Sequence, residues 1–301
     1  MTSAARLYVA PKDVRANWLG RYMGVERQFD QELFDALTEA TKAIDKELLK
    51  LKGVDAKGAA VRRLQLSLAH REIRKQINLT YGDIGTLVRG YRNKAAEAAV
   101  EATLKHESRT LARLLPSKVA RTAYGESLRV SARRNIESVV ARVLQTQQPL
   151  SQRLYKSKAL ANGLVSRAIN NGLARGDSAA DISRAVHNLV SPKVPGGVTY
   201  VAKRLGRTEI NNAFHAQAIY DAQQNPVVTH MRWNLSKEHA STPNDPCEMY
   251  AFIEIFDKNS VPEKPHPNCR CFVTPETDDY DVFESQLLQG HFDEYLDDIL
   301  G

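Results

Sequence analysis

The sequence predicts a mainly α-helical protein: a long-helical N-terminal body, a small β-containing module with His and Cys, and an acidic C-terminal helix. Three observations predict this class. Through most of the first 226 residues, apolar residues recur every three or four positions, as on the buried face of a helix. At residues 231–235 the pattern changes to alternation, which is typical of a strand. The last 26 residues carry nine acidic side chains, no Lys or Arg, and apolar residues at helical spacing.

The first half of the chain is expected to form long helices joined by short turns. A first amphipathic helix is predicted over 26–51, and a break follows between Gly53 and Gly58. Helical spacing then resumes over 61–78, and a second apolar stripe runs from Ile84 to Ala102. Pro116 interrupts the pattern before it resumes over 127–145. The stripe of the first helix consists of Phe29, Leu33, Leu37, Ala40, Ile44, Leu48 and Leu51.

A helix, a stop and a second helix are predicted over 164–190. Gly176 suits the left-handed position that ends a helix. Asp177 or Ser178 suits the N-cap of the next helix, and Ser178 with Asp181 resembles a capping box. Residues 191–197 then read as a loop, and a further helix is expected to end before Pro226.

Four regions follow from these patterns: a long-helical region (1–149), a second helical region (150–226), the His/Cys module (227–275) and the acidic tail (276–301). Strands are predicted in the module at 231–235, 251–256 and 271–273. The tail is an amphipathic docking segment, and packing onto this same chain is favoured over packing onto a partner.

Composition excludes some classes and favours others. No segment approaches the run of about 18–20 apolar residues that a membrane span needs, and the N-terminus lacks a secretory signal pattern. Synthesis in the cytoplasm is therefore expected. Removing the nine acidic residues of the tail from the 35 in the chain leaves 26 against 42 Lys and Arg, a net charge of about +16. This excess suggests contact with a polyanion, an acidic partner or the tail itself, and a merely solvated surface is the alternative.

The chemistry is concentrated in "PHPNCRCF", residues 265–272. It holds His266, Cys269 and Cys271, and the remaining cysteine is Cys247. A module of about 50 residues has a small core and commonly needs a stabilising cross-link, such as a bound metal. Thiolate and imidazole favour zinc, held by four protein ligands when the site is structural. The expected ligands are His239, Cys247, His266, Cys269 and Cys271, with Asp245 a further candidate.

Alternatives to the metal remain open at this point. One alternative is that the three cysteines are reduced thiols with no metal bound. Another is that either Cys269 or Cys271 is simply a buried side chain and not a ligand. A disulfide is disfavoured in the cytoplasm. A Cys–His dyad has no supporting motif, and the sequence contains no Gly-x-Ser-x-Gly, Walker or Gly-x-Gly-x-x-Gly pattern. No catalytic residues and no cofactor other than zinc are therefore expected.

The segment "GRTEINNAFHAQAIYDAQ", residues 206–223, carries polar side chains one helical turn apart. Arg207 and Asn211 form one such pair, and Asn211 and His215 form the next. The favoured interpretation is a polar helix face that braces the β module through hydrogen bonds. The alternative is a face that grips a partner.

Three stretches, taken in order, resemble the C-terminal region of phage Mu F-like minor head proteins, also called phage head morphogenesis proteins. They are "GLARGDSAADISRAV", "RTEINNAFHAQAIYDA" and "MRWNLSKEHASTPNDPCEMYA" with "PHPNCRCFVTPE". The resemblance covers residues 150–275, roughly 40% of the chain. Many members carry a Cys-x-x-Cys before the closing motif, whereas here Glu248, Met249 and Tyr250 follow Cys247. The resemblance makes His239 the natural replacement for the missing cysteine.

The resemblance implies a non-enzymatic virion protein of the phage head, made in the host cytoplasm and placed near the portal vertex. Such a protein binds the portal protein, joins major capsid or scaffold proteins during procapsid assembly, and assists genome packaging or delivery. Nonspecific contact with double-stranded DNA would suit the basic body. The alternative function is a zinc-stabilised nucleic-acid-binding protein or nuclease. An unrelated coiled-coil adaptor would leave the "HPNCRC" run unexplained.

Overall fold

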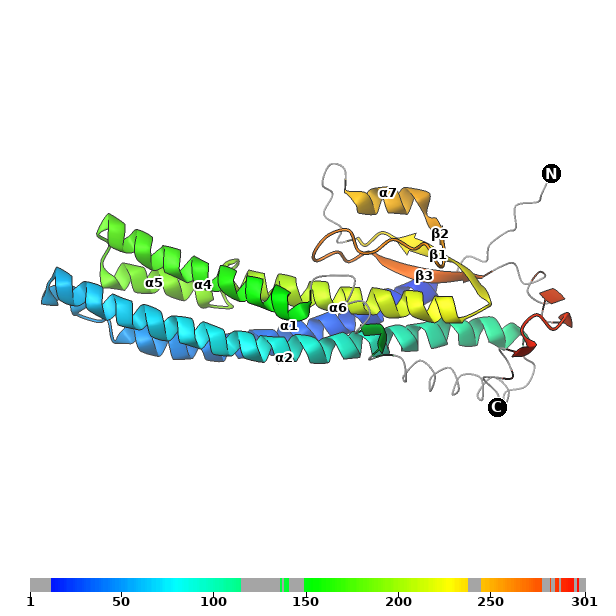
Figure 1. Cartoon of the computed structure of the whole chain (residues 1–301), viewed down its shortest axis with the longest axis horizontal. Helices are drawn as coiled ribbons and strands as arrows, with labels where there is room; N and C mark the ends of the chain where they lie inside the picture. The colour runs from blue at the N-terminus through cyan, green and yellow to red at the C-terminus, as the bar shows by residue number, and fades with distance from the viewer. Residues whose placement is uncertain are drawn as a thin grey trace. The chain divides into compact units, whose positions relative to one another are not determined.

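The computed structural model describes residues 12–114, 136, 138–140, 149–237 and 245–277, together with 282, 285–286, 288–294 and 297. The predicted helix at 127–145 and the acidic C-terminal helix lie mostly outside these residues. The described chain is mainly α-helical with one small sheet, as predicted (Figure 1). Its elements are α1 (Lys12–Leu49), the 3-10 helix η1 (Val54–Lys57), α2 (Ala59–Leu114), α4 (Leu150–Arg175), α5 (Ala179–Val190), α6 (Gly197–Gln224), β1 (Val228–Asn234), α7 (Pro246–Ile253), β2 (Ile255–Asp257) and β3 (Phe272–Thr277).

The chain divides into two compact units. The helical unit comprises Arg27–Gly90 and Gln147–Arg207, and the mixed unit comprises Met1–Glu26, Tyr91–Thr146 and Thr208–Gly301. Helices α1, α2 and α6 each contribute residues to both units. Each unit is described below by itself.

The helical unit has an apolar core between α1, α2, α4, α5 and α6. The first predicted stripe is confirmed except at Ala40, which is half-buried: Phe29, Leu33, Leu37, Ile44, Leu48 and Leu51 are all buried. The predicted stop is confirmed as well, since Gly176 has a φ of 78° and closes α4. Ser178 is the N-cap of α5 and accepts a hydrogen bond from the backbone N–H of Asp181 at 3.1 Å.

The mixed unit combines a three-stranded antiparallel sheet with helices on either side. The strand order is β2-β1-β3, and Arg232 of β1 lies opposite Ile255 of β2 and Thr274 of β3. In Figure 1 the sheet lies between α6 and α7. Trp233 of β1 makes edge contacts with the rings of His215 on α6 and Tyr250 on α7, with centroids 5.8 and 5.0 Å apart. The sheet is thereby fixed to both helices.

Two sequence predictions are corrected by the structure. The strand predicted over 251–256 is wrong for its first half, because α7 runs to Ile253 and β2 begins at Ile255. Asp245 caps α7 by accepting from the Cys247 N–H at 2.9 Å, and Pro246 follows at the first helical position. This start signal outweighs the β propensity of the residues that follow. The stripes at 61–78 and 84–102 belong to one continuous helix, α2.

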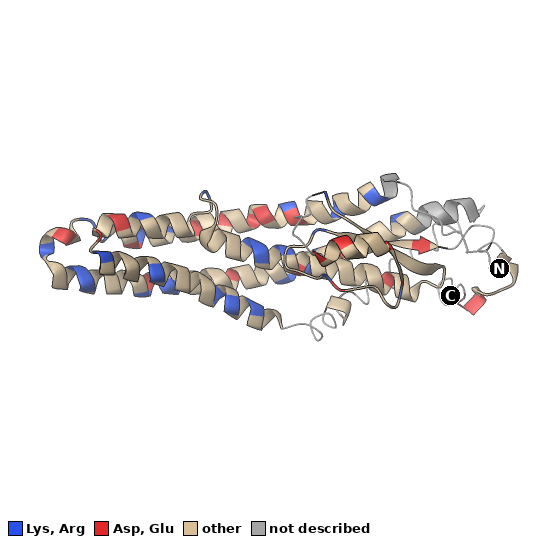
Figure 2. Ribbon diagram, turned by 90° about the horizontal axis from the view of Figure 1, so that it is seen from above, with Lys and Arg blue, Asp and Glu red and all other residues tan. Residues whose placement is uncertain are grey.

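Charge and hydropathy agree with the helical architecture. Lys and Arg recur along the helices with acidic residues between them (Figure 2). Within the part of the chain that the structure describes, no helix is both long enough and apolar enough to cross a membrane.

Candidate metal centre

Two segments of the mixed unit bring the cysteines and His266 together. Cys247 is the second residue of α7. His266, Cys269 and Cys271 lie in the loop between β2 and β3. Asn268 turns this loop in the left-handed region with a φ of 62°, and its N–H donates to Thr208 Oγ1 at 2.9 Å. The loop is therefore held in the curvature that points its ligand side chains toward α7.

The donor atoms have the spacing of a tetrahedral metal site. Cys247 Sγ lies 3.3 Å from His266 Nε2 and 3.5 Å from Cys269 Sγ, and these three donor atoms all lie within 4.8 Å of one another. With Zn–S near 2.3 Å and Zn–N near 2.0 Å, tetrahedral geometry puts two sulfurs about 3.8 Å apart and a sulfur and a nitrogen about 3.5 Å apart. The observed separations match these within a few tenths of an ångström. Cys247, His266 and Cys269 could therefore hold a metal ion.

Cys271 belongs to the same cluster. Its thiol interacts with the thiols of both Cys247 and Cys269, and all three cysteines are buried and free of disulfides. Residues 269–271 directly precede β3, and in extended backbone residues two apart lie on the same side, so both thiols can face the cluster. A third thiol thus lies beside the two cysteines of the cluster, while the three donors that all lie within 4.8 Å of one another are Cys247, His266 and Cys269.

The side chain of His266 is arranged to present Nε2. Its Nδ1 lies 3.1 Å from the carbonyl oxygen of Pro267, so a proton on Nδ1 is hydrogen-bonded and Nε2 has a free lone pair. Asp245 Oδ2 lies 3.5 Å from the same Nε2, while Asp245 Oδ1 caps α7. Asp245, one of the candidate ligands, is thereby the helix cap and a neighbour of the cluster.

The electrostatics favour a thiolate at Cys269. Hydrogen bonds from the thiols of Cys247 and Cys271 lower the pKa of Cys269, and the ammonium of Lys264 lowers it further. The pKa of Cys247 is raised, first by its hydrogen bond to Cys269 and then by Cys271. Burial lowers the pKa of Lys264, whose Nζ donates to the Cys271 carbonyl and lies 5.3 Å from the Trp233 ring centroid. A metal bound by thiolates would gain charge compensation from this lysine.

A nucleophilic role for Cys247 does not suit this geometry. Its side chain touches His266, but the residue is fully buried, and its raised pKa keeps the thiol protonated. The converging donors of Cys247, His266 and Cys269 are instead suited to holding a metal ion. Reduced thiols without metal remain the alternative. His239, the other predicted ligand, lies outside the described residues.

The helix α6 braces this module, but of the predicted residues Arg207, Asn211 and His215 only His215 bonds to it among the contacts of the described residues. Thr208 accepts the hydrogen bond from Asn268, and His215 Nε2 donates to the carbonyl of Pro262 at 3.0 Å. Burial, and then Lys264, lower the pKa of His215 to about 3, so its imidazole is neutral. Arg207 instead pairs with Asp30 of α1 within the helical unit. The bracing comes from Thr208 and His215.

Sequence reasoning missed Lys264 and Arg270. Arg270 lies between Cys269 and Cys271 and pairs with the buried Glu26 of α1, which also accepts from the Tyr22 hydroxyl at 2.8 Å. The alternation Cys-Arg-Cys was a usable signal, since the middle residue must point away from the two thiols. The loop is thus tied to α1 as well as to α6.

Comparisons with protein-family models, with curated proteins and with solved structures found no match to this chain.

Proposed function

We propose that this chain is a phage minor head protein of the Mu F-like class, which binds the portal vertex and assists procapsid assembly and genome packaging or delivery. The observation that carries the proposal is the convergence of the motif residues. The cysteines and His266, which close the resemblance, meet at one buried site, and the Arg-Thr-Glu segment of α6 supports the loop that carries them. The ordered motifs thereby have a common structural role.

The metal in this proposal is zinc in a structural role. Three thiols and one imidazole are the donor set that favours zinc among the common divalent ions. A module that buries only a small sheet gains much of its stability from such a cross-link. The proposed activity is accordingly binding, with no reaction catalysed at the cluster.

The outer side of α7 supplies a surface for the portal or for a capsid or scaffold protein. Met249, Phe252 and Ile253 expose 54%, 91% and 49% of their surface, although all three lie on a helix of eight residues. Exposed apolar side chains gathered on one short element mark interaction sites more often than single exposed residues do. The metal cluster at the start of α7 would hold this surface rigid, which lowers the entropic cost of association.

Co-purification with the portal protein encoded by the same phage tests the proposal. The wild-type chain is expected to co-purify with the portal and to be found in purified virions by immunodetection at one vertex. Phe252→Asp should abolish co-purification, while Leu160→Asp, at a 46% exposed position of α4, should not. Absence from virions together with no portal binding would overturn the proposal.

The nuclease alternative has a simple discriminating experiment. Supercoiled DNA incubated with the protein and magnesium is nicked by a nuclease, whereas a structural protein at most retards its migration. We expect retardation without nicking.

A further inference from the structure

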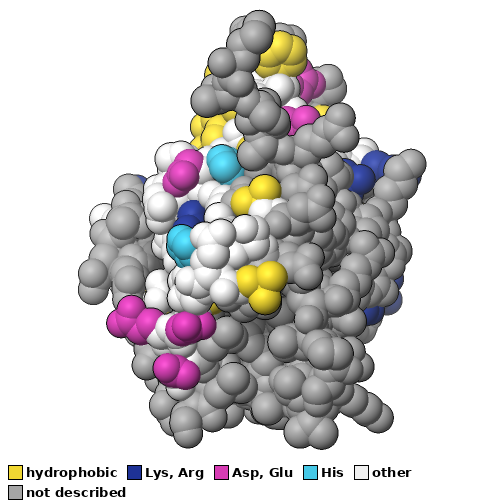
Figure 3. Space-filling view, turned by 90° about the vertical axis from the view of Figure 1, so that its right-hand side faces the viewer, with side chains coloured by type: hydrophobic (Ala, Val, Ile, Leu, Met, Phe, Trp, Pro, Cys, Tyr) yellow, Lys and Arg dark blue, Asp and Glu magenta, His cyan; other side chains and the backbone are white. Residues whose placement is uncertain are grey.

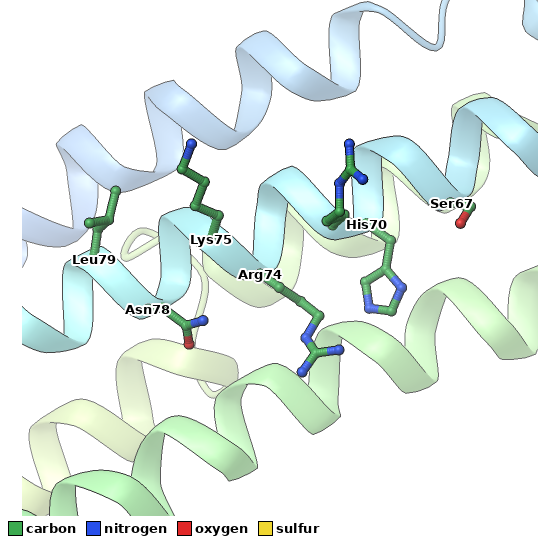
Figure 4. A pocket seen from close by; sticks show the side chains of 7 residues that line it. Ser67, His70, Arg74, Lys75, Asn78 and Leu79 are labelled. Carbon is green, nitrogen blue, oxygen red and sulfur yellow. The ribbon is translucent and has the colours of Figure 1, made fainter.

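One face of α2 in the helical unit forms an open depression of about 580 Å³ (Figure 4). Six polar residues line it together with one leucine: Ser67, His70, Arg71, Arg74, Lys75 and Asn78. They lie at positions 67, 70–71, 74–75 and 78, so that successive groups are three or four residues apart and share one side of the helix. We refer to this depression as the basic groove.

Contacts with α4 shape the basic groove. His70 Nε2 lies 2.8 Å from Ser166 Oγ, and Asn162 Nδ2 donates to Asn78 Oδ1 at 3.0 Å. The Asn78 carbonyl is therefore occupied, and its amide NH₂ is left as a donor. The groove presents hydrogen-bond donors along its length, and its ends are fixed by the neighbouring helix.

Positive charge dominates the basic groove. Arg74 has no acidic partner among the residues that the structure describes, and it lies close enough to His70 to lower the pKa of that imidazole, after burial. The nearest acidic side chain is Glu72, which contacts Lys75 and Arg71 only loosely, at 3.9 and 3.8 Å. The Glu72 carboxylate is thus shared by Arg71 and Lys75, and the charge of Arg74 is not neutralised by a described acidic side chain. A ligand with several negative charges would complement this surface.

We propose that the basic groove binds the phosphate backbone of double-stranded nucleic acid. Donors from Ser67 to Asn78 span about 16 Å along the helix axis, at 1.5 Å per residue. A row of this length suits successive phosphates of a polymer better than it suits one small anion. The lining contains no Phe, Tyr or Trp, so it lacks the large aromatic stacking platform on which single-stranded bases are held. By contrast, Figure 3 shows acidic, histidine and apolar side chains interspersed on another face.

The inference specifies the nucleic-acid part of the proposed function, but it rests on the basic groove and not on the metal centre. Contacts of this kind read phosphates and not bases, so binding should be independent of sequence. Each phosphate neutralised should contribute about 0.9 to the slope of log K against log salt concentration.

Fluorescence anisotropy with two labelled 25-base-pair duplexes of unrelated sequence tests the inference. The groove variant is Arg71→Ala/Arg74→Ala/Lys75→Ala. The matched control is Lys42→Ala/Lys50→Ala/Arg184→Ala, which removes the same charge from exposed sites of the same unit that already have acidic partners. We expect equal binding of both duplexes by the wild type. The groove variant should lose at least about tenfold in affinity and about 2.7 in salt slope, and the control should change less than about threefold in affinity.

Three results would overturn the inference: no duplex binding at low salt, equal losses in the groove and control variants, or groove-dependent binding of polyglutamate but not of the duplex. Thermal melting of each variant confirms that the fold is retained. Portal co-purification, measured on the same variants, separates the two proposals. It should be unaffected by the groove substitutions. Any of the three overturning results, obtained while the wild type still binds the portal, would therefore refute the role of the basic groove and leave the proposed function standing.

Discussion

Cys247 Sγ lies 3.3 Å from His266 Nε2, although the two residues are 19 positions apart and come from different elements. The contact joins the first turn of α7 to the loop before β3. Cys269 Sγ lies 3.5 Å from the same sulfur, so three donors from two segments meet at one point, where both cysteines are buried and His266 is half-buried. The module that follows α6 is therefore closed by side-chain chemistry more than by the size of its core.

Replacing Cys247 should unfold the module. Cys247→Ser removes a ligand common to both short contacts, and we expect a loss of at least about 3 kcal/mol in the free energy of unfolding. Thermal unfolding with and without a chelator measures this. The chelator should lower the melting temperature of the wild type and leave the variant unchanged.

Met249→Ser is the matched control, because Met249 is on the same helix but 54% exposed. It should melt within a few degrees of the wild type and keep its sensitivity to the chelator. Equal melting of Cys247→Ser and the wild type would contradict the role of the cluster.

Thr208 should matter through its hydrogen bond to the loop. Thr208→Ala leaves the Asn268 N–H without its acceptor, at a residue that the left-handed turn depends on. We expect a loss of about 1–2 kcal/mol in chemical denaturation. Thr86→Ala, at an exposed site of α2 where the hydroxyl bonds only to its own helix, should change stability by less than about 0.5 kcal/mol. A larger stability loss for Thr86→Ala than for Thr208→Ala would show that the loop does not need its hydrogen bond to α6.

The pair between Arg270 and Glu26 gives a test by double substitution. Arg270→Leu leaves a carboxylate that is only 3% exposed facing an apolar side chain, which should cost about 3 kcal/mol. Adding Glu26→Gln removes the buried charge and should restore part of that loss. Denaturation of the two single variants and the double variant measures the coupling, and strictly additive losses would mean that the two side chains do not interact.

Asp221 should make stability depend on pH. Burial raises its pKa to about 7, from an ordinary value near 3.8, while Gln217 and Thr103 donate to it. Between these two values the folded state keeps a proton that the unfolded state releases, so this residue lowers stability as pH rises from about 4 to about 7. Asp221→Asn should therefore gain stability relative to the wild type across that window, by on the order of 2–4 kcal/mol at pH 8.

Unfolding of both proteins at pH 4.5 and pH 8 checks this expectation. His215, with a lowered pKa of about 3, has the opposite effect, because its contribution is complete above about pH 6.5 and is lost as pH falls. The His215 effect is the same in the wild type and in Asp221→Asn, so the difference in stability between the two proteins reports on Asp221 alone. A difference that does not change with pH would contradict the assignment.

Several features were predictable because local rules decide them. The stop at Gly176 and the cap at Ser178 depend on backbone geometry and one hydrogen bond, and both are confirmed. The choice of Cys247, His266 and Cys269 as candidate ligands came from residue chemistry alone, and the structure brings them together. The role of His239 stays a prediction, since it lies outside the described residues.

Other features depend on tertiary contacts that a sequence pattern does not contain. The last three residues of α7, 251–253, were predicted as part of a strand, because apolar residues suit both structures and the cap at Asp245 decided between them. Lys264 and Arg270 were missed because their partners, the Cys271 carbonyl and Glu26, become neighbours only after folding. Placement of both Cys269 and Cys271 beside Cys247 likewise required the turn at Asn268.

Metal content of the purified protein, measured by elemental mass spectrometry together with thiol titration before and after chelation, tests the central claim most directly. We predict one zinc per chain and three thiols that become reactive only when the metal is stripped. Absence of metal, with three thiols that react at once, would contradict the account and leave the cluster held by packing and hydrogen bonds alone.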